Sequence, residues 1–162
     1  MNIKTFLSAF ILTLICFVSQ GHAQQKFSRA AFYVVIDSSE VAAIDDELAI
    51  IKASAPAGKD GFEGALLMRK AGKVHGAKNK LELFKAGRIK LETAIIAEPE
   101  NTEFRFLRLA IEEHAPKIVK YHNDIEKDRL MIQKSFKTLP QTVQHAIINY
   151  TKKSKVLHAE DF

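Results

Sequence analysis

The chain has 162 residues, a formal net charge of +5 and 47% hydrophobic residues, values that suit one globular domain with an ordinary core. It contains one cysteine, which excludes an intramolecular disulfide framework and a thiolate metal site, so burial of apolar side chains has to supply the stability. The charge is mild, and no aromatic and glycine motifs interleave the lysines, which argues against nucleic acid as a partner.

The N-terminal segment has the features of a secretory signal. A lysine precedes an apolar run from residue 6 to 18, and Gly21 and Ala23 place small residues at the two positions that a signal peptidase reads. The run is too short to span a bilayer comfortably, and no later stretch approaches the roughly 18 consecutive apolar residues of a transmembrane helix. We therefore expect residues 1–23 to be cleaved and residues 24–162 to form one exported domain, periplasmic or extracellular, with no membrane anchor.

The first part of this domain is expected to form a helical hairpin. The run from residue 27 to 36 combines β-branched and aromatic residues, which favour a strand, with adjacent alanines, which favour a short buried helix; we predict a helix. Asp37 and Glu40 have the spacing of a capping box and predict a second helix that ends near Ala53. Residues 54–61 contain a proline and two glycines, and predict a loop.

Two further helices are predicted before the next proline. The first is expected to run from residue 62 to 74, with Gly76 as its cap, and the second to begin near Lys78. The second carries an apolar stripe at helical spacing, formed by Leu81, Phe84, Leu91 and Ile95. Gly87 lies inside that stripe, where a glycine costs about 1 kcal/mol relative to alanine. We expect close packing to compensate for this cost, which predicts a neighbouring helix whose backbone approaches closely at Gly87.

Pro99 separates this helix from the next. Proline cannot continue a helix, and Asn101 is a favoured N-cap for a helix from about Thr102 to His114. We expect the helices on the two sides of Pro99 to fold back on each other as an antiparallel hairpin.

Four residues of this hairpin resemble a known repeat motif. Gly87, Leu91, Ala94 and Pro99, separated by four, three and five positions, are similar to the second-helix signature of a tetratricopeptide repeat, a unit of about 34 residues. The resemblance covers about one half-repeat. It implies tetratricopeptide-like helical hairpins with a concave face that binds a peptide or protein. The stretch from 62 to 162 also resembles a family of uncharacterised exported bacterial proteins whose hallmark is the block around RFLRL and APK, and this resemblance implies no function.

The chain after Pro116 predicts the remaining helices. Two of them follow pairs of residues with capping-box spacing, namely Asn123 with Glu126 and Thr138 with Gln141. The last helix has an apolar face formed by Val143, Ile147 and Tyr150. Altogether we expect an all-α fold of about six or seven helices, packed as antiparallel hairpins.

A candidate binding surface combines polar residues with the apolar face of the helix after Pro99. Its residues are Arg105, Arg108, Glu112 and Tyr121. Arginine forks beside an apolar face suit the carboxylates of a peptide or protein partner. The alternative is internal pairing of Arg108 with Glu112, and of Arg105 with Glu92 or an acid between residues 124 and 128.

No catalytic or phosphate-binding motif is present, so we predict a non-enzymatic exported scaffold that binds a protein or peptide and needs no cofactor. The alternative is a metal-dependent or hydrolytic enzyme with a site around His114, His122, Asp124 and Asp128. A metal site would use His122, Asp124, Glu126 and Asp128, because these residues include pairs one helical turn apart. Such pairs are more often solvated or salt-bridged.

Overall fold

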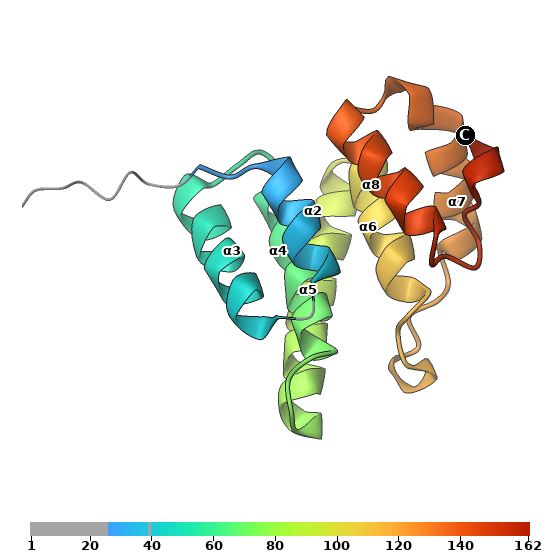
Figure 1. Ribbon diagram of the computed structural model, residues 1–162. Helices are drawn as coiled ribbons and strands as arrows, with labels where there is room; N and C mark the ends of the chain where they lie inside the picture. The colour runs from blue at the N-terminus through green and yellow to red at the C-terminus, as the bar shows by residue number, and fades with distance from the viewer. Residues whose placement is uncertain (1–25, 39) are drawn as a thin grey trace, which may run out of the picture.

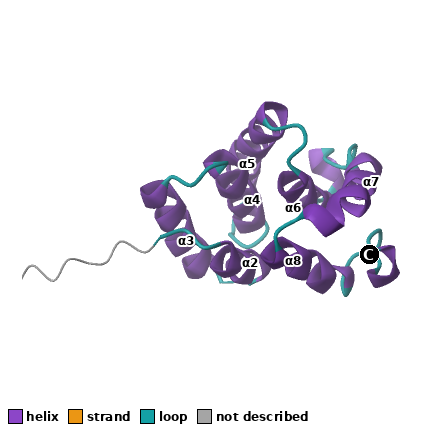
Figure 2. Ribbon diagram, turned by 90° about the horizontal axis from the view of Figure 1, so that it is seen from above, coloured by secondary structure: helices purple, strands orange, loops and turns teal. Residues whose placement is uncertain are grey.

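The computed structural model describes residues 26–38 and 40–162, and the described part of the chain contains helices and loops without any strand (Figures 1 and 2). The α-helices are α2 (Arg29–Asp37), α3 (Val41–Ser54), α4 (Lys59–Ala71), α5 (Ala77–Ala97), α6 (Thr102–Glu112), α7 (Ile125–Ser135) and α8 (Gln141–Thr151). Three short 3-10 helices are η1 (Lys117–Val119), η2 (Phe136–Thr138) and η3 (Ala159–Asp161). The prediction of an all-α fold with six or seven helices is confirmed for these residues. The predicted signal segment lies outside them.

The ambiguous stretch near the N-terminus is a helix, α2, as predicted. Phe32 is completely buried there, and its ring packs edge-on against Phe62 of α4 at 5.0 Å between centroids. The capping box expected after this stretch is wrong. Asp37 is still the last residue of α2, and Glu40, at the N-cap of α3, makes no side-chain capping bond. Helix α3 therefore begins at Val41 and not directly after Asp37.

The glycines around α4 and α5 do not all act as predicted. The loop expected over residues 54–61 is shorter, because Gly58 adopts a left-handed conformation with a φ of 72° and α4 begins at the next residue. Gly76, expected to cap α4, instead precedes α5 with a φ of 85°.

The close approach predicted at Gly87 is confirmed, and the neighbouring helix is α4. A Cβ atom added at Gly87 would lie 2.6 Å from the carbonyl oxygen of Gly64. A Cβ atom added at Gly64 would lie 2.7 Å from the carbonyl oxygen of Gly87 and 2.6 Å from the backbone nitrogen of Leu91. The two backbones therefore touch where each helix carries a glycine, and this contact joins α4 to α5.

Helix α6 forms the centre of the molecule (Figure 1). Its predicted N-cap is confirmed, since the backbone N–H of Phe104 donates to the side chain of Asn101 at 3.2 Å. Nine of its 11 residues are buried, because α6 contributes to two hydrophobic clusters. Phe104 and Leu107 join the cluster built from α2 to α5, whereas Phe106 and Leu109 join the cluster built with α7, α8 and the C-terminal tail.

The C-terminal helices begin without the predicted capping boxes. Helix α7 follows Asp124 and α8 follows Pro140, and neither N-cap residue makes a side-chain capping bond. The Thr138 hydroxyl donates instead to the carbonyl of Ser135, at 2.7 Å. The apolar face of α8 is confirmed, because Val143, Ile147 and Tyr150 are all buried. No helix within residues 26–38 and 40–162 has both the length and the apolar character to cross a membrane.

Candidate binding groove and the buried arginine network

The two arginines singled out from the sequence share one buried carboxylate. Arg108 donates through Nε and Nη2 to the two oxygens of Asp128, at 2.7 and 2.8 Å, and Arg105 donates to Asp128 at 3.2 Å. Asp128 is completely buried, and both arginines are at most 7% exposed. Burial alone would lower the pKa of Arg108, but the hydrogen bond and charge of Asp128 raise it above its ordinary value. The network ties α6 to α7.

The other two candidate residues belong to the same network. The Tyr121 hydroxyl donates to Glu92, which also pairs with Arg108 at 2.9 Å. One oxygen of Glu112 accepts a hydrogen bond from the backbone of Asp124, at 3.2 Å. Burial raises the pKa of Glu112 to about 7, although that hydrogen bond and the charge of Arg108 act in the opposite direction.

These contacts are the internal pairing considered from the sequence, with the predicted kind of partner for Arg105 and different partners for Arg108. Arg108 pairs with Asp128, Glu92 and Asp124 rather than with Glu112, and Arg105 pairs with Asp128. All four candidate side chains are enclosed, so a partner could reach them only if α6 and α7 separated. Their role in binding stays a prediction, and the accessible surface has to be sought elsewhere.

The residues proposed for a metal or hydrolytic site face different neighbours. His122 Nδ1 donates to the carbonyl of Glu112 at 2.8 Å, whereas His114 Nδ1 lies 3.1 Å from the carbonyl oxygen of Ala110. Glu126 pairs with Arg129 on the surface at 2.6 Å, and both Asp124 and Asp128 pair with Arg108. Among the described residues, no group of three or more His, Cys, Asp or Glu side chains is placed to hold a metal ion.

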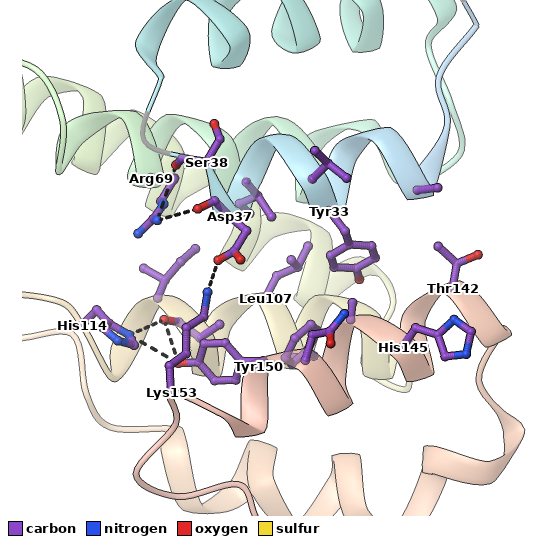
Figure 3. A pocket seen from close by; sticks show the side chains of 18 residues that line it. Tyr33, Asp37, Ser38, Arg69, Leu107, His114, Thr142, His145, Tyr150 and Lys153 are labelled. Carbon is purple, nitrogen blue, oxygen red and sulfur yellow. Dashed lines mark hydrogen bonds and ion pairs between the residues drawn. The ribbon is translucent and has the colours of Figure 1, made fainter. Parts of the chain in front are cut away.

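An open groove lies between α2 and α8, with α6 as its floor (Figure 3). Its volume is about 890 Å³. The floor consists of the apolar residues Phe106, Leu107, Ala110 and Ile111. One wall is formed by Ala30, Tyr33 and Val34 of α2, and the other by Thr142, His145, Ala146, Asn149 and Tyr150 of α8. Val34 is 72% exposed, so an apolar side chain stands uncovered at the rim.

One end of the groove is polar and carries two cationic side chains, Arg69 and Lys153. Lys153 forms an ion pair with Asp37 and so connects the chain after α8 to the last residue of α2 (Figure 3). Burial lowers the pKa of Lys153. Arg69, from α4, donates through Nη2 to the carbonyls of Asp37 and Ser38, at 3.3 and 3.5 Å. Figure 3 shows these side chains at one end and Thr142 and His145 at the other.

This groove could not be predicted directly from the sequence, because its walls come from opposite ends of the chain. One signal was available in α8, where Thr142, His145 and Asn149 recur every three or four positions and so occupy one helical face. A polar face opposite the buried one is typical of any surface helix, so this signal alone does not distinguish a groove from solvent.

Comparison of the chain with protein-family models, curated proteins and solved structures finds no match.

Proposed function

We propose that the protein is an exported, non-enzymatic binding module that holds a short apolar segment of a protein or peptide partner in the groove between α2 and α8. The observation that carries this proposal is the groove itself, with a volume of about 890 Å³ and an apolar floor formed by α6. Ligand pockets of about 300–1,000 Å³ with apolar linings and few polar groups are typical binding sites. Export rests on the sequence features of the N-terminal segment.

Exposed and partly buried apolar residues of the groove support an apolar ligand. Val34 is exposed at the rim, above a floor in which Ala110 and Ile111 are partly buried. A ligand side chain of the size of leucine contributes about 1.5–3 kcal/mol when it is fully buried, so a few such contacts suffice for specific binding.

The polar contacts around the groove hold its walls in place. The Tyr150 hydroxyl donates to Glu113 at 2.8 Å, and Lys153 pairs with Asp37. These bonds hold α8 and the segment after it against α2 and α6. These two contacts therefore maintain the shape of the groove.

Selection of peptides from a random-sequence display library on the purified protein tests the proposal. The discriminating variant is Ala30→Trp, because Ala30 is exposed and lines the groove, so an indole there would occupy the space of a ligand. The matched control is Ala49→Trp, which places the same side chain at an exposed alanine of α3 outside the groove. Circular dichroism and thermal melting establish that both variants fold.

We expect enriched peptides with apolar positions that bind the wild type and Ala49→Trp but not Ala30→Trp. Peptides that bind the folded Ala30→Trp variant as tightly as the wild type would overturn the proposal. A selection that yields no peptide above an empty support would overturn it too.

A further inference from the structure

We propose that the polar end of the groove is a carboxylate site that receives the free C-terminus of the bound peptide. This inference rests on the proposed function, since it names the chemistry of the ligand in the same groove. It is carried by an arginine with unused donors, by the engagement of the nearby acids with other groups and by the groups along α8.

Arg69 has no carboxylate partner, and part of its guanidinium group makes no hydrogen bond. Its Nη2 group reaches only two neutral carbonyls at long distances, and its Nε atom is buried without a hydrogen-bond partner in the described structure. The other five arginines are engaged: Arg29, Arg105, Arg108 and Arg129 pair with carboxylates, and Arg88 lies over the ring of Tyr121. A guanidinium fork with free donors has the geometry that a carboxylate accepts with both oxygens.

The acids near Arg69 are engaged by other groups. Lys153 is the second cation at this end, and Asp37 already pairs with Lys153. The oxygens of the nearby Glu113 carboxylate accept hydrogen bonds from the hydroxyls of Tyr150 and Ser154 and from the backbone N–H of Lys155. Neither acid forms an ion pair with Arg69, so an incoming carboxylate would give this guanidinium a direct partner. The exposed imidazoles of His114 and His145 also line the groove.

The wall formed by α8 favours a peptide over a fatty acid. Thr142, His145 and Asn149 present hydrogen-bonding groups along one face of the helix, which suit the N–H and C=O groups of a peptide backbone. An acyl chain offers no partner to these groups. From Thr142 to the end of α8 at Thr151 the axis measures about 14 Å, at about 1.5 Å per residue. An extended peptide covers that length with about four residues.

The direction of the ligand follows from the two ends of the groove. Its C-terminal carboxylate would lie between Arg69 and Lys153, and the preceding residues would extend toward Thr142 (Figure 3). The apolar side chains of the ligand would lie on Leu107 and Ile111, which form part of the floor.

The test uses an N-acetylated pentapeptide of alternating leucine and alanine, made with a free C-terminal carboxylate and with a C-terminal amide. Isothermal titration calorimetry compares the two forms on the wild type. We expect the carboxylate to bind at least about tenfold more tightly, as charge-assisted hydrogen bonds do relative to neutral ones. The preference should disappear in Arg69→Gln, with the affinity of the amide unchanged, and should persist in the control Arg129→Gln.

Each outcome decides the proposal. If both forms bind the wild type equally, and neither binds Ala30→Trp, the carboxylate site is wrong and the groove proposal stands. If neither form binds at millimolar concentration, both proposals are overturned. If dodecanoate binds the groove more tightly than the peptide carboxylate, the ligand is an acyl chain and the peptide assignment is wrong. The comparison of carboxylate and amide needs only the wild type, so it holds even if Arg69→Gln fails to fold.

Discussion

Replacing either glycine at the contact between α4 and α5 should destabilise the protein, although alanine is the better helix former. In an unobstructed helix interior, Gly→Ala stabilises by about 1 kcal/mol. At Gly64 or Gly87 the added Cβ atom would lie 2.6 Å from a backbone atom of the other helix, whereas ordinary contacts begin at 3.4 Å. The helices would have to separate locally by roughly the difference, 3.4 minus 2.6, or 0.8 Å.

The magnitude follows from the two opposing effects. Overpacking costs about 1–3 kcal/mol, and the upper part of that range applies because a backbone atom cannot rotate away as a side chain can. Subtracting the gain in helix propensity leaves a net loss of about 2 kcal/mol for Gly64→Ala or Gly87→Ala. For a domain of this size, such a loss lowers the melting temperature by about 8 °C. Urea and thermal denaturation followed by far-ultraviolet circular dichroism measure both quantities.

Gly72→Ala is the matched control for this prediction. A Cβ atom there meets only the carbonyl oxygen of Arg69, at 3.3 Å, and the backbone has an ordinary helical φ of −70°. Its stability should stay within about 0.5 kcal/mol of the wild type. The double variant of Gly64 and Gly87 should lose less than the sum of the single losses, because one separation of the helices relieves both contacts. A Gly64→Ala protein as stable as the wild type would show that α4 and α5 can separate at this contact without a loss of free energy, contrary to this prediction.

Three further predictions concern the polar contacts. Asp128→Asn leaves Arg105 and Arg108 buried without their shared carboxylate and should cost about 3–5 kcal/mol in urea denaturation; a loss below about 1 kcal/mol would contradict the network. Burial raises the pKa of Glu112 to about 7, so the folded protein favours the protonated carboxyl. The stability that this protonated form contributes is fully present below the ordinary pKa of 4.5 and is lost as the pH rises through 7. Glu112→Gln should therefore be more stable than the wild type at about pH 8 and equal to it near pH 4, and a difference independent of pH would contradict this sign. Glu113→Ala removes the acceptor of three hydrogen bonds that hold the C-terminal segment, so hydrogen exchange should accelerate in residues 154–162 but not in α3; unchanged protection of the tail would show that these bonds are dispensable.

The apolar periodicity of the sequence and its helix-breaking residues were sufficient to predict the main helices. The apolar stripe around Gly87, the break at Pro99 and the N-cap at Asn101 indicate α5 and α6, and the structure has both. The capping-box pairs failed, as at Asp37 and Glu40, because that spacing is common in sequences and does not by itself determine where a helix begins. The close approach at Gly87 was predictable, but its partner Gly64 was not, because the choice between two neighbouring helices depends on the packing.

Less of the candidate site than of the fold could be predicted from the sequence. The sequence alternative of an acid between residues 124 and 128 as the partner of Arg105 agrees with the structure, where that acid is Asp128. That Arg108 shares Asp128, which lies on another helix 20 positions away, follows only from the packing. The sequence shows one apolar face of α6, whereas the folded helix is buried on two sides. The groove combines α2 with α8, more than 100 positions apart in the chain, so its lining follows only from the topology.

Amide NMR spectra of the protein, recorded with increasing amounts of the acetylated leucine-alanine pentapeptide carboxylate, locate the bound peptide residue by residue. If the peptide occupies the groove, the resonances that shift belong to residues of the groove, above all Val34, Leu107, Ala110, Ala146 and Asn149. Shifts confined to α3 or to the exposed face of α5, or spectra that do not change at millimolar peptide, would contradict binding in the groove.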